Sequence, residues 1–281
     1  MQKTARLHGR KFSIAPIIKY IFLAVCIFTA LFPLIIVLFN AFKTNTEYVN
    51  TSVFTPSKSF LNFENFKTAF ISGKLVKGFM NSLILIVVPV ILNIYLGTMT
   101  AYAVERFDFK LKKVILLMYT FAILIPNTTT QVATFSIIKS MGVYNTYFAG
   151  FLLYAGTDMI QVYIYRQFLG EIPYALDESA MIEGASRFKI YTSIVLPLLR
   201  PATVTVVILK GIAIYNDLFN IYLYMPSKRT VSYALYTFAA ENNSQWTVMS
   251  AAIIIALIPS LIVYFCAQRS IYDGLVTGSV K

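Results

Sequence analysis

The sequence predicts an all-α, polytopic membrane protein. Three observations support this: 58% of the 281 residues are hydrophobic, only 13% are charged, and the apolar residues gather in long uncharged runs. A typical soluble domain has about 25% charged residues, and a helix needs about 20 apolar residues to cross a bilayer. Most of the surface is therefore expected to face lipid.

Four uncharged runs are long enough to predict one spanning helix each. They cover residues 20–42, 78–104, 114–138 and 242–268. Two further apolar segments, 146–168 and 201–223, also have the length of a span but contain ionisable residues. Counting both gives six transmembrane helices.

The basic residues predict the orientation of these spans. A group of them precedes the first run without any acidic residue: Lys3, Arg6, Arg10, Lys11 and Lys19. By the positive-inside rule the N-terminus is cytoplasmic, and six spans return the C-terminus to the same side. The lysines of segment 43–77 fall outside on this count and conflict with the rule, whereas the other loops agree. The net charge of +12 thus belongs to loops, and does not indicate a nucleic-acid partner.

The chain divides by loop character into residues 1–77 and a five-helix core, residues 78–281. Segment 44–77 is expected to form short helices on the outer face, and 226–246 a polar external loop before Trp246, an interfacial anchor. Cys26 and Cys266 lie inside apolar runs and are interpreted as packing residues. His8 is alone, so neither a metal site nor a catalytic site is predicted.

Residues 171–200 are too apolar for a solvated loop and too charged for a span. Pro173 suits a first helical turn, and Gly184 can end that helix in a left-handed conformation. Ser186 is a plausible cap for a second helix, which is expected to end before Pro197. These signals predict two short helices that something else covers.

Small side chains gather on the first of these two helices. Ala175, Ser179 and Ile182 share one face, with Ala180 and Gly184 beside it. Because small side chains bury little area, we expect them to allow close approach of another protein.

This segment resembles the cytoplasmic coupling loop of ABC importer permeases. That loop has the pattern Glu-Ala-Ala, three residues, Gly, nine residues, Ile-x-Leu-Pro. The sequence here has Glu178-Ser179-Ala180, three residues, Gly184, nine residues, then Ile194-Val195-Leu196-Pro197. Every spacing matches, and the one departure exchanges a small residue for another, at Ser179.

Other motifs are similar to the maltose and oligosaccharide type of permease. They are Phe79-Met-Asn81-Ser82-Leu83, Met141-Gly-Val-Tyr-Asn145-Thr146, Ala267-Gln268-Arg269, Gly274-Leu275 and Gly278-Ser-Val280-Lys281. The resemblance covers nearly the whole chain and implies a carbohydrate as cargo.

The family resemblance implies a type I importer fold in the bacterial inner membrane and several partners. They are a second homologous permease subunit, two ATPase subunits and an extracytoplasmic solute-binding protein. ATP and Mg would bind the partner subunits, because this chain has no Gly-x-x-x-x-Gly-Lys-Ser/Thr loop and is not expected to be an enzyme. Glu178 would pair with a basic group of the ATPase, with Ser179, Ala180 and Gly184 packed closely against it.

Two charges within predicted spans need an explanation. Asp158 and Lys210 each lie about ten residues from the predicted cytoplasmic boundary, or about 15 Å along a helix. Such residues usually face the bundle interior or a cavity, so we expect the two to face each other beside the substrate route. The alternatives are a pair between Lys210 and Asp217, snorkelling of Lys210, or a purely structural contact.

Spans four and five also supply groups suited to sugars. Aromatic faces and hydrogen-bonding side chains bind sugars, which predicts further pathway residues: Gln161, Tyr163, Tyr215, Asn216 and Asp217. The partner permease could equally hold most of these contacts.

Three alternative functions remain open from the sequence. A permease of the same class could carry a polyol, glycerol phosphate or an amino acid. A membrane-embedded enzyme would need converging His, Asp or Ser side chains, which the sequence does not suggest. A structural scaffold would make the coupling motif a coincidence.

Overall fold

A computed structural model describes residues 14–241 and 245–277, and throughout these residues it contains helices and no strand. The all-α prediction is confirmed. His8, the basic residues before Lys19 and the tail from Gly278 lie outside the described residues. The helices are α1 Ile14–Ala41, α2 Asn45–Asn50, α3 Glu64–Ser72, α4 Leu75–Arg106, α5 Lys112–Leu124, α6 Asn127–Ser140, α7 Tyr147–Ala155, α8 Met159–Glu171, α9 Ala175–Ile182, α10 Arg187–Ile190, a π-helix Tyr191–Val195, α11 Leu196–Leu198, α12 Arg200–Asn216, α13 Phe219–Tyr224, α14 Val231–Glu241 and α15 Trp246–Thr277.

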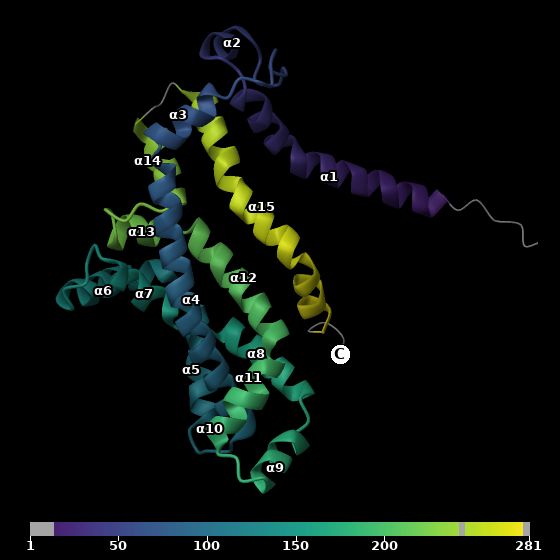
Figure 1. Ribbon diagram of the computed structural model, residues 1–281, viewed down its shortest axis with the longest axis vertical. Helices are drawn as coiled ribbons and strands as arrows, with labels where there is room; N and C mark the ends of the chain where they lie inside the picture. The colour runs from purple at the N-terminus through teal and green to yellow at the C-terminus, as the bar shows by residue number, and fades with distance from the viewer. Residues whose placement is uncertain (1–13, 242–244, 278–281) are drawn as a thin grey trace, which may run out of the picture.

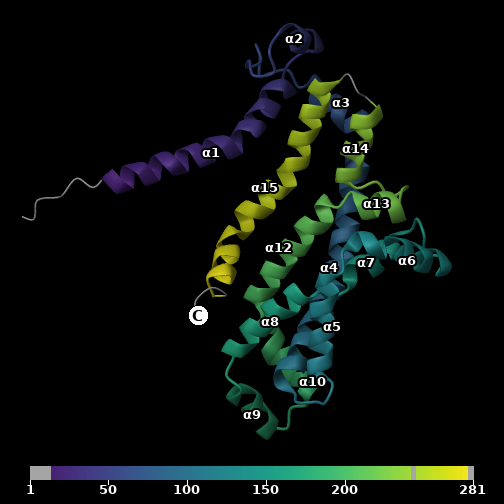
Figure 2. The ribbon, with the colours of Figure 1, turned by 180° about the vertical axis from the view of Figure 1, so that it is seen from behind.

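Three helices are long and apolar enough to cross a membrane unbroken, namely α1, α4 and α15. Helices α4, α12 and α15 follow the long axis of the molecule, whereas α1 leaves it and extends sideways (Figures 1 and 2). Helix α1 packs chiefly against α15, and within its apolar window none of the described residues is buried. Its surface is therefore left for lipid or for another subunit.

The other three predicted spans are broken helices, so single helices over these segments were the wrong expectation. Residues 114–138 form α5 and α6, whose axes differ by 108°. Pro126 disfavours helical geometry at Ile125, the residue before it, which explains why α5 ends at Leu124. The fourth span breaks between α7 and α8, and the fifth between α12 and α13.

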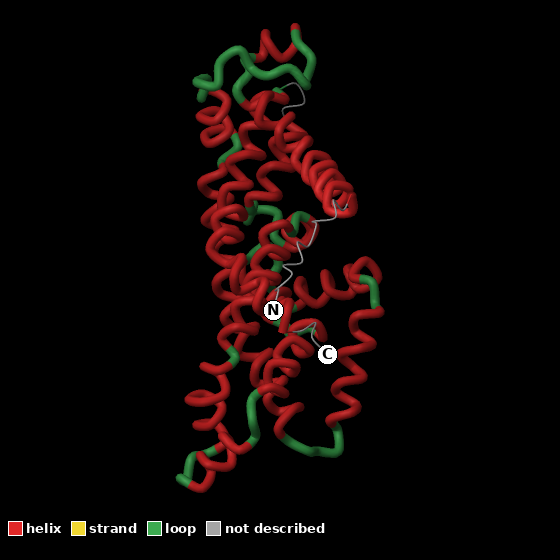
Figure 3. Tube along the Cα trace, turned by 90° about the vertical axis from the view of Figure 1, so that its right-hand side faces the viewer, coloured by secondary structure: helices red, strands yellow, loops and turns green. Residues whose placement is uncertain are grey.

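Helix α4 connects three clusters of buried apolar side chains along the molecule. The α9-end cluster lies at the end formed by α9 and α10, and contains Ala101, Tyr102, Tyr165, Leu169, Ala180, Ile190, Tyr191, Val195, Leu199, Ala202 and Val206. A middle cluster includes Leu85 and Val90. A third, at the end formed by α3, includes Leu75. Since all three contain residues of α4, this helix is the spine of the fold. Figure 3 shows that helices and loops alone make up the described residues.

Polar side chains of α3 and α4 hold the connections around this spine. Asn65 donates to the carbonyls of Ala41 and Lys43 at 2.8 and 2.7 Å. Asn81 donates to the carbonyl of Arg229 at 2.8 Å and accepts from the Tyr147 hydroxyl at 2.6 Å. Each amide satisfies backbone groups at a loop, where regular helix bonds are missing.

The loops differ in one respect from the sequence prediction. Segment 44–77 contains the expected short helices, α2 and α3. In contrast, the expected polar loop 226–246 contains helix α14, whose residues Val231–Ala240 are apolar. Polar residues flank this short apolar stretch on both sides, so the sequence pattern did not predict a helix there.

The second short helix does not end before Pro197, as the sequence predicted. Helix α10 continues through the π-turn into α11, which contains Pro197, and the chain bends by 73° only before α12. The N–H of Leu196 bonds to the carbonyl of Tyr191, five residues back. This wider turn relieves the clash that a proline makes with the preceding turn of an α-helix.

Candidate functional site

Helices α9 and α10 meet in a turn at one end of the molecule (Figure 1). Gly184 has φ +81° and its N–H bonds to the carbonyl of Met181, while the N–H of Ala185 bonds to that of Ala180. This pair of bonds is a Schellman ending, which glycine adopts without steric cost. Ser186 accepts from the N–H of Lys189 and caps α10, so both local predictions are confirmed.

The residues of the coupling motif point in two directions. Glu178, Ser179, Gly184 and Pro197 are exposed, and the neighbouring Ile182 is 89% exposed. Glu178, Ser179, Ile182 and Gly184 thus face outward on the α9 turn, whereas Pro197 lines a separate hollow with Ile91, Ile94 and Tyr95 of α4.

Other motif residues face the chain's own core, which corrects one expectation. Ala180 is 8% exposed and belongs to the α9-end cluster, against which Ile194 and Leu196 also pack. The small side chain of Ala180 therefore allows α9 to approach its own bundle, and not an external partner. The sequence alone could not separate these two uses of a small residue.

One site residue was missed by the sequence analysis, namely Arg106 at the end of α4. Its Nε lies 3.2 Å from Oδ2 of Asp177, with side-chain exposures of 8% and 0%. Its terminal nitrogen donates to the carbonyl of Ile172 at 2.8 Å, and its guanidinium lies 5.5 Å from the ring centre of Tyr174. One side chain thus holds the elbow between α8 and α9.

Two more polar contacts tie the same region to α4. Arg166 of α8 donates to Glu105 at 2.8 Å, and the hydroxyls of Thr98 and Tyr191 are 2.8 Å apart and buried. Helix α4 is therefore joined by polar bonds to α8, α9 and the π-turn.

The ion pair expected between Asp158 and Lys210 is present. Asp158 precedes α8 and caps it, accepting from the N–H of Gln161 at 2.9 Å. The alternative pair of Lys210 with Asp217 does not form, because Asp217 accepts from Tyr154 at 3.0 Å and from Asn220 at 2.6 Å. Asp217 instead stabilises the break between α12 and α13.

Asn93 of α4 stabilises the break before α8. Its side-chain amide donates to the carbonyl of Gly156 at 2.6 Å, and its backbone carbonyl accepts from the Gln161 side chain at 2.9 Å. Non-helical backbone is tolerated at membrane depth only where such partners or a wet cavity satisfy it. Gln161 is 2% exposed, so its expected place on a substrate route is wrong and its amide holds α8 against α4.

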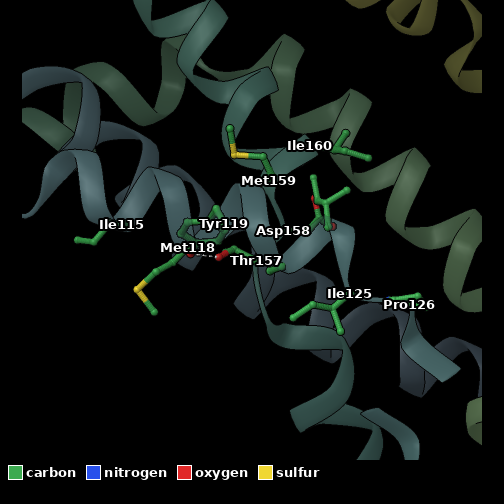
Figure 4. A pocket seen from close by; sticks show the side chains of 11 residues that line it. Ile115, Met118, Tyr119, Ile125, Pro126, Thr157, Asp158, Met159 and Ile160 are labelled. Atoms are coloured by element: carbon green, nitrogen blue, oxygen red, sulfur yellow. Dashed lines mark hydrogen bonds between the residues drawn. The ribbon is translucent and has the colours of Figure 1, made fainter. Parts of the chain in front are cut away.

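Asp158 of this pair lines an open pocket of about 780 Å³ between α5 and the start of α8. Figure 4 shows Asp158 beside Thr157, whose hydroxyl lies 2.5 Å from that of Tyr119. Apolar side chains complete the lining: Ile115, Met118, Ala122, Ile123, Ile125, Pro126, Met159 and Ile160. The mixture suits a ligand with hydroxyl groups and an apolar face.

The remaining expected pathway residues are dispersed. Tyr163 is 52% exposed and Asn216 is exposed, but neither lines this pocket. The hydroxyl of Tyr215 donates to the carbonyl of Ala256 at 2.7 Å and ties α12 to α15. Among the side chains that the structure describes, no group of His, Cys, Asp or Glu is placed to hold a metal ion.

Comparison with protein families gives one match, to the binding-protein-dependent transport system inner membrane component family, over residues 93–275. A probable starch degradation products transport system permease protein of Thermoanaerobacterium thermosulfurigenes is 33% identical, covering 89% of this chain and 91% of the relative. A melibiose/raffinose/stachyose import permease protein of Bacillus subtilis is 30% identical, with the same coverages.

The fold matches a solved structure. A bacterial ABC transporter involved in the import of the acidic polysaccharide alginate contains a chain that superimposes with a TM-score of 0.81, at 18% identity. The match covers 94% of this chain and 99% of that one. At this identity the likeness concerns the arrangement of helices.

Proposed function

Because the chain belongs to the binding-protein-dependent transport system inner membrane component family, we propose that it forms half of the translocation pathway of an ATP-driven oligosaccharide importer. The geometry that supports this most is the exposed α9 turn, which presents Glu178 and Ser179 outward at one end of the molecule. The names of the relatives support the cargo, since starch products and the melibiose, raffinose and stachyose group are saccharides.

The proposed complex has the remaining parts on other chains. A second permease subunit completes the pathway and covers α1, whose apolar window is unburied in the described residues. Two ATPase subunits bind ATP and Mg and receive the α9 turns. An extracytoplasmic solute-binding protein delivers cargo, as in the solved alginate transporter with its bound periplasmic protein.

The proposed topology has six membrane crossings with both termini in the cytoplasm of a bacterial cell. Three crossings are α1, α4 and α15, and two more are the bent pairs α5–α6 and α10–α12. The sixth is α7 with α8. On this topology the α9 turn is cytoplasmic and α3 is external.

The pocket beside Asp158 and Lys210 is the proposed section of the route contributed by this chain. A neutral sugar would meet the Tyr119 and Thr157 hydroxyls and the carboxylate of Asp158, while the ion pair keeps the wall close to neutral. Tyr163 and Asn216 would act on the route only from an exposed surface shared with the partner permease.

Movement follows from ATP binding on the partner subunits. Closing of the ATPase dimer brings the two α9 turns together, and the packed helices rotate as rigid bodies between inward-facing and outward-facing states. The chain itself receives work and performs no hydrolysis.

The test uses the whole complex with its binding protein in lipid vesicles. Maltotriose, raffinose, stachyose, arabinotriose and galactobiose are compared with sorbitol, glycerol 3-phosphate and glutamine as stimulators of ATP hydrolysis. We expect one of the oligosaccharides to stimulate most. Stimulation by glycerol 3-phosphate, sorbitol or glutamine alone would identify a different cargo for the same class of permease.

The docking surface is tested separately. Glu178→Lys should abolish copurification of the ATPase subunits, because it reverses the charge at the centre of the outward face. Glu171→Lys, an equally exposed reversal at the end of α8, is the matched control and should retain them. Equal retention by both variants would contradict docking at Glu178.

A further inference from the structure

The attachment of α9 to its own bundle is narrow. Of its eight described residues, Asp177 and Ala180 are the two that are buried. Ala180 offers a methyl group to the α9-end cluster, and such apolar contact is non-directional, so it permits sliding. The other contacts are the packing of the partly buried Met181 against the same cluster and the ion pair with Arg106.

Asp177 and Glu178 are neighbours with opposite orientations. Successive residues on a helix differ by about 100°, so the Glu178 side chain is exposed while Asp177 is fully buried. Any force that a partner applies at the exposed face of α9 therefore reaches α4 mainly through the opposite face, at Asp177.

Arg106 connects α4 to α9 and to the segment before it, so it can transmit this force. It is the last residue of α4 and contacts the carboxylate of Asp177, the carbonyl of Ile172 and the ring of Tyr174 at once. Its directional hydrogen bond is the one to the carbonyl of Ile172, whereas Nε and the Asp177 carboxylate form a buried charge contact at 3.2 Å without hydrogen-bond geometry. The three contacts set the angle between α9 and α4.

We infer that the Arg106–Asp177 ion pair is a positioning element that converts displacement of α9 into movement of α4, and thereby sets how much substrate is transported per ATP. This inference rests on the proposed function. It differs from the docking role of Glu178, because loss of the pair leaves the docking surface in place and allows α9 to move without α4.

The decisive variant is Arg106→Met with Asp177→Leu in the complete vesicle-reconstituted complex. Replacing a buried ion pair by apolar residues of similar volume is often neutral for stability, so this protein is expected to fold and to copurify with its ATPases. Hydrolysis should continue at a similar rate. Uptake per ATP of the oligosaccharide that best stimulates the wild-type complex should fall about tenfold, within the usual range of site-to-site coupling.

Two further variants separate this role from simple stability. Arg106→Lys keeps the charge but loses the planar fork, so an intermediate loss of uptake per ATP is expected with unchanged assembly. Asp108→Asn alters a fully exposed carboxylate in the Asp108–Lys112 pair nearby, and should behave as wild type.

The outcomes are distinct from those that test the function. Wild-type uptake per ATP in the Met–Leu variant would overturn the inference while leaving the importer function intact. Loss of ATPase copurification in that variant would also overturn it, because the pair would then serve only to hold the docking surface in shape. If the wild-type complex moves no substrate, the proposed function itself fails.

Discussion

Two of the ion pairs in the described part of the chain occupy contrasting surroundings. Arg106 and Asp177 are 8% and 0% exposed at the α9 end, whereas Lys210 and Asp158 are 23% and 42% exposed beside the pocket. The first pair is buried beside the α9-end cluster and joins α4 to α9. The second borders open space at a break in a helix, where a ligand can reach it. The mechanical role proposed for the first pair and the binding role proposed for the second therefore correspond to a difference in burial.

The largest effect on stability is expected from Asp177→Ala, which leaves the Arg106 charge buried without its partner. Breaking a buried pair in this way costs about 3–5 kcal/mol. Thermal unfolding of the detergent-solubilised complex should show a clearly lower midpoint. If Asp158→Ala lowers the midpoint by the same amount, the contrast between the two pairs is wrong.

Gly97→Ala tests whether α4 and α8 are tightly packed against each other in the middle of the molecule. An added Cβ would lie 2.2 Å from Nε2 of Gln161, which is itself bonded to Asn93. Overpacking of this kind costs about 1–3 kcal/mol, again measured by thermal unfolding. Gly211→Ala on α12 is the control, since its Cβ would meet Ile86 at an ordinary 3.8 Å. Equal midpoints for the two variants would mean that the α4–α8 contact is loose as well.

Gly184→Ala tests the rigidity of the α9 turn with a smaller expected effect. Its φ of +81° is costly for a residue with a side chain, although nothing lies within 4 Å of the added Cβ. We expect a loss of about 1–2 kcal/mol and faster hydrogen exchange at the N–H groups of Gly184 and Ala185. Gly170→Ala, in helical α8 and equally uncrowded, should be neutral or slightly stabilising. A loss with both variants would remove φ as the cause.

The smallest effect on stability is expected from Asp158→Asn. A partly exposed pair contributes about 1 kcal/mol or less, so the melting midpoint should hardly change. Stimulation of ATP hydrolysis by the preferred oligosaccharide should nevertheless decrease, because a hydrogen-bond acceptor of the pocket is altered. Unchanged stimulation and uptake would exclude Asp158 from the route.

The sequence predicted what depends on local chemistry or on strong hydrophobicity. The helical class, the glycine ending at Gly184 and the cap at Ser186 follow from nearest neighbours. The Asp158–Lys210 pair could be predicted because two isolated charges in apolar segments, at matching depth, have few other partners.

What the sequence could not provide depends on contacts between distant segments. The partner of Asp177 lies on another helix, and first-turn acidic residues such as Asp177 and Glu178 are equivalent until their burial is known. The chain is apolar on both sides of the breaks near Ile125, Gly156 and Asp217, so its hydropathy does not change where the helices end. Hydropathy therefore detects a membrane segment but not its shape.

The asparagines of α4 have a consequence for biosynthesis. Asn81 bonds to Tyr147 and to the carbonyl of Arg229, and Asn93 donates to the carbonyl of Gly156. All three partners leave the ribosome after α4 itself. A nascent α4 therefore enters the bilayer before its asparagine amides have these partners. Its packing is completed only when the later helices are inserted, so correct packing of α4 depends on the late part of the chain.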